Sequence, residues 1–237
     1  HRDLHLSLRR QRQMCIRDRR GIDEGEYIGQ KILETMKGFN GVEIWASNNK
    51  LASVGNINNA IEEGASFTSF SGHGTPTSWA THPHEKGSWL PIGGYKVSNV
   101  NALKNSDKLT IVVLNACSNS KFDDEPNCLG WAFLSNENGG GIGSFGNTAL
   151  GWSYGGSYTI KGLCGLMELG TFKSYMKGAK TFGMLWGYTI NNYLKEVGRM
   201  YALDYKTVEE WQPFGDPSLM IASPSLPPNK PSTPEGP

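Results

Sequence analysis

The stretch from Leu109 to Cys117 constrains the fold of this 237-residue chain more than any other. It reads Leu-Thr-Ile-Val-Val-Leu-Asn-Ala-Cys and is followed by the polar run Ser118–Asp124. An apolar, β-branched run of this length is typical of a strand buried on both faces, as in a parallel sheet. Open parallel sheets place their chemistry just beyond the carboxyl ends of their strands. Cys117 therefore stands where a thiol can meet a ligand.

A second strand-like run, Ser66–Ser71, ends in Gly72-His73-Gly74. The flanking glycines predict a tight turn around His73 with close backbone approach. If the two runs are neighbouring strands, an imidazole and a thiol meet at one edge of the sheet, where the imidazole can deprotonate the thiol and later return the proton. Either residue alone is more often part of a core or a turn. Both together, at successive strand ends, favour a His73/Cys117 dyad.

Helical and strand-like segments alternate along the chain, which predicts a three-layer α/β fold with a mainly parallel central sheet. The stretch Thr75–Tyr95, rich in Pro, Gly, His and Trp, is predicted to be a long irregular surface loop. Helices are expected at 23–37, 54–64, 97–104, from 131 onward, 158–176 and 181–200; the other strands are expected at 42–46, 139–146 and, after a turn at 214–217, up to 221.

The formal net charge of +1 averages two unlike parts, because seven of the eight arginines lie in residues 1–20. A basic arm for nucleic acid or membrane is one interpretation. We prefer to interpret residues 1–20 as a non-native, adapter-derived segment and leave them out of the fold. The folded domain is then 21–222, and the Pro-rich residues 223–237 are predicted to be a linker to a further C-terminal domain. No apolar run approaches the roughly 18 residues of a membrane span, so no membrane span is expected. With the basic residues 1–20 left out, nucleic-acid binding is not expected either.

Other motifs carry less chemistry. Cys128 and Cys164 either pair in an oxidising compartment or are simply buried. No His/Cys spacing predicts a metal site, and His82 and His84 are expected at a pocket rim or in solvent. Gly141–Gly146 matches the dinucleotide-binding pattern only as bare spacing, so nucleotide binding is disfavoured.

Two longer motifs resemble a known family. Phe70-Ser-Gly-His-Gly74 and Asn115-Ala-Cys-Ser-Asn-Ser-Lys-Phe122 are similar to the catalytic His and Cys segments of the gingipain-type cysteine peptidases, which share the caspase-like fold. Trp152 and the closing Phe-Gly-Asp-Pro-Ser-Leu stretch are similar as well, and the match runs from about Gly21 to Ala222. Ser120 stands where a glycine is commoner. The resemblance further implies that the domain is N-terminally truncated, without its first strand or two.

The resemblance implies a secreted cysteine endopeptidase acting on polypeptides, with His73 as general base and Cys117 as nucleophile. It places the oxyanion hole at the backbone amides of Gly74 and Cys117, and Trp152 at the wall of the substrate pocket. Glu24 or Glu26 is the candidate third, acidic member, although acidic residues there also suit a helix N-terminus. No cofactor is required by this chemistry. The family allows a structural calcium ion, for which Asp123-Asp124-Glu125 is the weak candidate, and tethering to further extracellular domains is expected.

Two other classes of function remain open. A caspase-like domain can persist without turnover, as a scaffold or adhesion module of a secreted protein. A thiol-dependent acyltransferase of similar fold, such as a transpeptidase, would use the same two residues but pass the acyl group to an amine.

Overall fold

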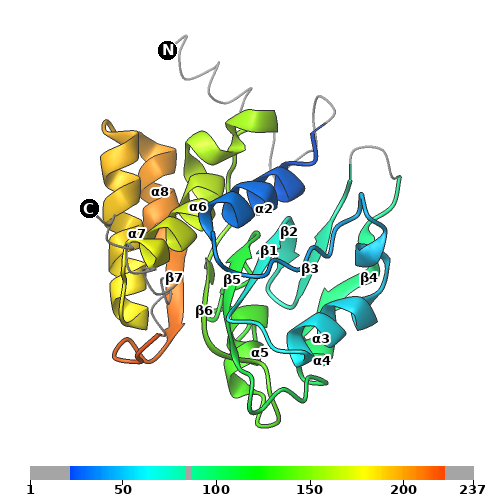
Figure 1. Cartoon of the computed structure of the whole chain (residues 1–237). Coiled ribbons are helices and arrows are strands. Elements are labelled where there is room, and N and C mark those ends of the chain that lie inside the picture. The colour runs from blue at the N-terminus through cyan, green and yellow to red at the C-terminus, as the bar shows by residue number, and fades with distance from the viewer. Residues whose placement is uncertain (1–21, 84–86, 222–237) are drawn as a thin grey trace, which may run out of the picture.

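The computed structural model describes residues 22–83 and 87–221. Residues 1–20, His84 and the Pro-rich residues 223–237 lie outside these ranges. The α- and 3₁₀ (η) helices and the strands follow one another, as Figure 1 shows, in the order α2 (Glu24–Thr35), η1 (Lys50–Ala52), α3 (Val54–Glu62), β1 (Phe67–Ser71), β2 (His73–Thr75), β3 (Ser78–Thr81), β4 (Leu90–Lys96), α4 (Val97–Val100), β5 (Thr110–Asn115), α5 (Leu129–Ser135), β6 (Gly141–Asn147), η2 (Gly156–Lys161), α6 (Leu163–Met176), α7 (Phe182–Val197), α8 (Ala202–Glu210) and β7 (Trp211–Gly215).

The central sheet has four strands in the order β1-β5-β6-β7. β1, β5 and β6 are parallel, and β7 runs antiparallel to β6. All six residues of β5 are buried, because β5 has a strand on either side and helices over both faces. The predicted, mainly parallel sheet is confirmed, and so is the buried strand that precedes Cys117.

Alternate residues of β5 enter two different apolar cores. Ile111 and Val113 join a core formed with α2, α6 and α7, whereas Val112 and Leu114 join one formed with α3, α4 and α5. This follows from the two-residue period of a strand, which sends successive side chains to opposite faces. In Figure 1, α2 and α6 lie above the sheet as drawn and α3, α4 and α5 lie below it. The three-layer arrangement is therefore confirmed.

The helices largely follow the predicted periodicity. Ile28 and Ile32, four residues apart, are buried on one side of α2, and the side chain of Ser53 caps α3 by accepting the N–H of Gly55 at 3.1 Å. α6 and α7 confirm the two long helices, although the residues before Leu163 belong to η2. α4 is shorter than predicted, and α8 was not predicted at all.

The region predicted to be an irregular loop instead contains strands. β2, β3 and β4 form a three-stranded antiparallel sheet, so His73 lies in a strand rather than in a tight turn. The reason is aromatic packing: the rings of Trp79 and Tyr95 lie 5.2 and 5.3 Å from that of Phe70, which anchors this small sheet on β1. The many Pro and Gly residues of the stretch concealed its short strands.

Two predicted strands are wrong. Residues 42–46 form no strand, because a groove separates them from β1 and leaves their backbone without a neighbouring ladder. At the other end, the last strand is Trp211–Gly215, before the predicted turn rather than after it. Asp216 ends it by accepting the N–H and the hydroxyl of Ser218 at 2.8 and 2.7 Å, a local turn of the kind predicted. No helix in the described part of the chain is long and apolar enough to cross a membrane.

Candidate active site

The ends of β1 and β5 bring the predicted histidine and cysteine to one edge of the central sheet. The last paired residues of these parallel strands are Ser71 and Asn115, and His73 and Cys117 each follow two residues later. The two backbones stay in contact there: a Cβ atom placed on Gly74 would lie 2.5 Å from the carbonyl oxygen of Cys117. No side chain fits at that distance, so the glycine after His73 is what permits the approach.

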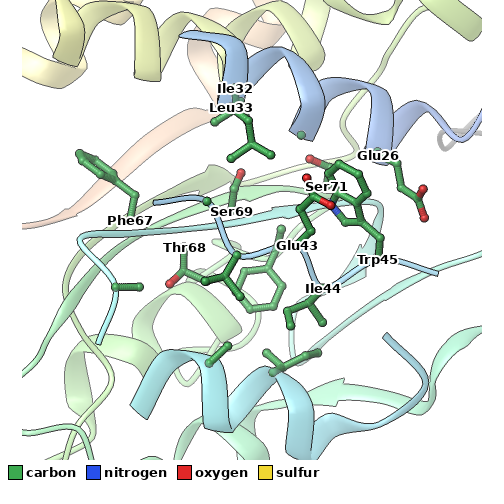
Figure 2. A pocket seen from close by; sticks show the side chains of 18 of the residues that line it. Glu26, Ile32, Leu33, Glu43, Ile44, Trp45, Phe67, Thr68, Ser69 and Ser71 are labelled. Atoms are coloured by element: carbon green, nitrogen blue, oxygen red, sulfur yellow. The ribbon is translucent and has the colours of Figure 1, made fainter. Parts of the chain in front are cut away.

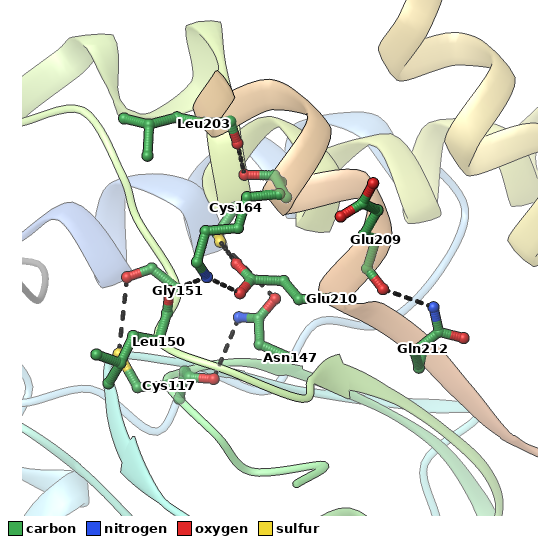
Figure 3. Close-up of polar contacts among 12 residues, drawn as sticks. Cys117, Asn147, Leu150, Gly151, Cys164, Leu203, Glu209, Glu210 and Gln212 are labelled. Carbon is green, nitrogen blue, oxygen red and sulfur yellow. Dashed lines mark hydrogen bonds and ion pairs between the residues drawn. The ribbon is translucent and has the colours of Figure 1, made fainter. Parts of the chain in front are cut away.

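The thiol of Cys117 lies between the end of β5 and the loop that follows β6. The residue is 5% exposed, and its Sγ lies 3.7 Å from the carbonyl oxygen of Gly151, as Figure 3 shows. Ser118 turns the chain sharply with a φ of 58°, and its N–H donates to the carbonyl of Ala149 at 2.8 Å. The loop after β6 is thereby attached directly to the turn after the cysteine.

An exposed tryptophan covers the imidazole of His73. The ring of Trp89 meets the His73 ring edge-on, with centroids 4.9 Å apart and planes at 85°. Trp89 also contacts His82 at 5.2 Å, which places that histidine near the candidate site. Trp89 is 50% exposed, so its ring is partly open to solvent. Only its placement in the three-dimensional structure reveals this contact.

Asn119 fastens the chain after Cys117 to the hairpin that carries His73. Its side chain is fully buried, and Nδ2 donates to the carbonyl oxygens of Thr75 at 2.6 Å and Ser78 at 2.9 Å. Both halves of the candidate dyad are therefore held by one amide group. In the sequence Asn119 stands out only as part of the cysteine motif, which gives no sign of this role.

The two candidate acids point to different neighbours. Glu24 is fully buried at the start of α2, and its Oε1 accepts the N–H of Gly156 at 2.6 Å. Glu26 accepts the N–H of Ser47 at 3.0 Å. Glu24 thus helps to hold the segment after Trp152, whereas Glu26 holds the segment before η1. α2 itself begins at the site edge of the sheet, since a Cβ on Gly25 would lie 2.8 Å from the carbonyl oxygen of Ser71.

Trp152 does lie beside the thiol. With Cys117, Gly72 and Cys164 it lines a cavity of about 10 Å³, which is barely enough for one water molecule. Its carbonyl accepts the N–H of Cys164 at 3.0 Å, which attaches the loop to the start of α6. Trp152 and Cys117 are thus neighbours, but the hollow between them is too small for a substrate side chain.

A much larger groove of about 470 Å³ lies along the outer edge of β1. Figure 2 shows its walls: Phe67, Thr68, Ser69 and Ser71 of β1 on one side, Glu43, Ile44 and Trp45 on the other, and Ile32 and Leu33 of α2 above. Neither His73 nor Cys117 lines it. The groove therefore lies along the outer strand β1 and is not part of the candidate dyad.

A buried carboxylate that was not predicted lies beside the last pair of residues of β1 and β5. Glu168 of α6 is fully buried and accepts hydrogen bonds from Ser69, Ser71 and Asn115. Burial raises the pKa of this carboxyl, and the three hydrogen bonds oppose that shift. A lone Glu in an apolar helix pattern was the only signal in the sequence.

The remaining thiols are in surroundings that keep them protonated. Burial, together with the nearby Glu210, raises the pKa of Cys164 to about 12, and burial also raises the pKa of Cys128. Neither forms a disulfide, which answers the alternative left open above in favour of burial. Glu210 lies beside Cys164, as Figure 3 shows, and forms an ion pair with Lys206.

No group of three or more His, Cys, Asp or Glu side chains in residues 22–83 and 87–221 is arranged to hold a metal ion. In the weak calcium candidate, Asp123 and Asp124 both face the ammonium group of Lys121. Both carboxylates therefore already have a cation beside them. A structural calcium ion stays a prediction.

Comparison with known proteins places this geometry in context. A family model described as peptidase family C25 matches residues 7–222. Gingipain R2 of Porphyromonas gingivalis is 26% identical over 167 residues, which are 70% of this chain and 21% of that protein. Gingipain R1 of the same organism is 26% identical over 167 residues, and the match covers 15% of it. The chain thus spans about a fifth or less of the curated relatives it matches.

Solved structures show the same fold. A structure described as a protease matches with a TM-score of 0.63 at 16% identity, covering 86% of this chain and 47% of the other. The crystal structure of the Arg-specific cysteine proteinase gingipain R matches with a TM-score of 0.56 at 18% identity, covering 84% and 42%. The predicted caspase-like fold is confirmed.

Proposed function

The chain belongs to peptidase family C25, and from this premise we propose that it is a cysteine endopeptidase with Cys117 as nucleophile and His73 as general base. The observation that carries the proposal is the joint end of β1 and β5. It brings the chain at His73-Gly74 into contact with the backbone of Cys117. One solved structure of similar fold is described as an Arg-specific cysteine proteinase, which supports this chemistry.

The reaction runs through a thioester. His73 takes the proton of the Cys117 thiol, and the thiolate attacks the carbonyl carbon of a peptide bond. The negative oxygen of the tetrahedral intermediate accepts hydrogen bonds from the backbone amides of Gly74 and Cys117; losing one such donor typically costs about 10²- to 10³-fold in rate. His73 gives its proton to the leaving amine, and water then attacks the thioester to release the acid and restore the thiol.

The other assignments follow from the same proposal. Trp152 contacts the substrate side chain next to the cleaved bond, supported by its place beside Cys117. Glu24 is the better of the two acidic candidates, because it is buried and α2 begins at the site edge. Its role is to fix the loop that carries Trp152. The substrates are polypeptides, the protein acts outside the cell, and further domains accompany this one.

A direct test uses the intact protein that contains this domain, under reducing conditions, with fluorescein-labelled casein as substrate. Cys117→Ala and His73→Ala should each abolish hydrolysis, because the first removes the nucleophile and the second the base. Cys128→Ala is the matched control, since Cys128 is also a buried cysteine but lies outside the dyad. Equal hydrolysis by the wild type and Cys117→Ala would falsify the assignment.

One observation favours the alternative of a scaffold without turnover: the thiol is 5% exposed, and the cavity beside it holds only about 10 Å³. Iodoacetamide distinguishes the two. An activated thiol reacts quickly near neutral pH, whereas Cys164, with a pKa of about 12, stays protonated and serves as an internal reference. Selective alkylation of Cys117 supports the peptidase, and equal, slow labelling of both residues supports the scaffold.

A further inference from the structure

The side chain of Glu168 joins the two strands that carry the candidate dyad. It projects from α6, where it is fully buried. One carboxylate oxygen, Oε1, accepts the hydroxyls of Ser69 and Ser71 of β1 at 2.5 and 2.6 Å. The other, Oε2, accepts the amide group of Asn115 of β5 at 2.7 Å. One carboxylate thus binds both strands from the same face of the sheet.

The position of this contact along the strands is specific. Ser71 and Asn115 are the last residues that β1 and β5 pair with each other. His73 and Cys117 lie two residues further along each strand. One helical turn before Glu168, α6 also contacts the loop that follows β6: the backbone N–H of Cys164 donates to the carbonyl oxygen of Trp152 at 3.0 Å. The carboxylate therefore binds at the point from which both candidate catalytic segments depart.

The chemistry of the contact is unusual for a residue whose only task is to fill space. None of the ion pairs formed by residues 22–83 and 87–221 includes Glu168. Burial disfavours its charge, and only three neutral donors compensate. An apolar side chain of similar size is often as good or better for stability at a buried charged position. A carboxylate differs from an apolar side chain because its two oxygens accept hydrogen bonds, which fixes where the donor groups lie.

We propose that Glu168 is a positioning residue, which fixes the separation of the His73 imidazole and the Cys117 thiol by binding β1 to β5 at their last pair. The inference rests on the proposed peptidase function. Glu168 itself does not touch the reacting atoms. Without it, Ser71 and Asn115 lose their common acceptor, and the two strand ends are free to shift relative to each other.

Thr68 offers a matched control. Its hydroxyl lies 3.0 Å from that of Thr110, so this pair also links β1 to β5, but at the opposite end of the strands. Thr68→Val removes a link between the same strands without disturbing the end near the dyad. Any general effect of weakening the β1/β5 pair should appear in this variant too.

The experiment measures the intact protein as wild type, Glu168→Gln and Thr68→Val. For each we determine the melting temperature, the apparent kcat and KM for fluorescein-labelled casein, and the pH midpoint of Cys117 alkylation by iodoacetamide. His73→Ala supplies the midpoint of a thiol without its imidazole. Ser71→Ala, which removes a single donor, replaces Glu168→Gln if that variant does not fold.

We expect Glu168→Gln to lower kcat by about 10- to 100-fold, the scale of a small misplacement of catalytic groups, with KM within about twofold of wild type. The alkylation midpoint should move toward that of His73→Ala. The double variant Glu168→Gln/Asn115→Asp, which exchanges the amide and the carboxylate across the contact, should recover part of both losses. Thr68→Val should lower the melting temperature and leave kcat and the midpoint near wild type.

The proposal is overturned if Glu168→Gln lowers the melting temperature alone, or if Thr68→Val lowers kcat as much at equal stability. Failure of the peptidase function would look different. In that case the wild type shows no hydrolysis that depends on Cys117, and its alkylation midpoint equals that of His73→Ala.

Discussion

Gly74 is the residue at which the addition of one methyl group should separate the two halves of the candidate site. A Cβ atom there would lie 2.5 Å from the Cys117 carbonyl oxygen and 2.6 Å from Nδ2 of Asn119. Both neighbours are held in place, so the backbone has to move. We expect Gly74→Ala to reduce hydrolysis by about 10²-fold or more and to lower stability by about 1–3 kcal/mol.

Gly87→Ala is the control for that prediction, because a Cβ on Gly87 meets no atom within 4 Å. It should leave both activity and the melting temperature close to wild type. If Gly74→Ala is as active as Gly87→Ala, the contact between Gly74 and Cys117 has no role in the reaction.

Glu168 should also give the stability of the protein a characteristic pH dependence. Burial raises its pKa above the 4.5 of an exposed glutamate. The native state then binds the proton more tightly than the unfolded state. The protonated carboxyl therefore stabilises the native state below about pH 4.5, and this stabilisation is lost as the pH rises through the native pKa. The free energy of unfolding of the wild type, relative to Glu168→Gln, should fall over that interval.

Urea unfolding of both proteins at a series of pH values tests this. The difference between them cancels the contributions of the other titrating groups. A difference that is constant, or that grows as the pH rises, would mean that the hydrogen bonds from Ser69, Ser71 and Asn115 outweigh burial and hold the native pKa at or below 4.5.

At the scale of elements, local pattern was sufficient where an element carries its own signal. β5 was predictable because Ile111–Leu114 form an uninterrupted apolar run, most of it β-branched, and α2 because Ile28 and Ile32 recur at helical spacing. Residues 42–46 also contain residue types typical of strands but form no strand, because strand formation requires a neighbour and a groove lies there instead. β3 was not predicted because its position depends on the packing of Trp79 against Phe70 of β1, a contact between the small sheet and the central sheet that the local sequence does not show.

The candidate site divides in the same way. His73 and Cys117 were identified because each ends a strand-like run and carries a reactive group. Asn119, Trp89 and Glu168 were not, because their importance lies in partners that only the folded chain supplies. Sequence patterns point to the groups that react more readily than to the groups that hold them.

Helix α7 contains two glycines that should respond oppositely to alanine. A Cβ on Gly187 would meet no atom within 4 Å, whereas one on Gly183 would lie 2.9 Å from both Cβ and the carbonyl oxygen of Pro217. Gly187→Ala should therefore raise the free energy of unfolding by about 0.5–1 kcal/mol, the usual difference between these residues inside a helix. Gly183→Ala should lower it, because the turn at Pro217 has to move. Thermal unfolding of both variants measures the difference, and a similar shift in both would contradict this account of α7.

For the molecule as a whole, the central sheet is finished differently at its two edges. β7 closes one edge by running antiparallel to β6. β1 forms the other edge of the described sheet, and an apolar groove of about 470 Å³ lies against it. On either side of β1, the N–H of Gly72 donates to the carbonyl oxygen of Asn115, and the carbonyl oxygen of Ser66 accepts the N–H of Ile111. The even-numbered residues of β1 therefore direct their backbone N–H and C=O groups toward β5. The odd-numbered residues direct theirs into the groove, because hydrogen-bonding direction alternates along a strand.

This alternation predicts the pattern of amide hydrogen exchange across the molecule. The amides of Thr68 and Phe70 should exchange slowly, close to the rate for the central strand β5, because β5 holds them in a ladder. The amide of Ser69, which faces the groove, should exchange faster, since opening it requires no separation of strands. β6 is the internal control: it pairs with β5 on one side and β7 on the other, so its neighbouring amides should show no such alternation. Residue-resolved exchange measured by NMR distinguishes the cases, and equally slow exchange at Thr68, Ser69 and Phe70 would mean that another segment occupies the groove and pairs with β1.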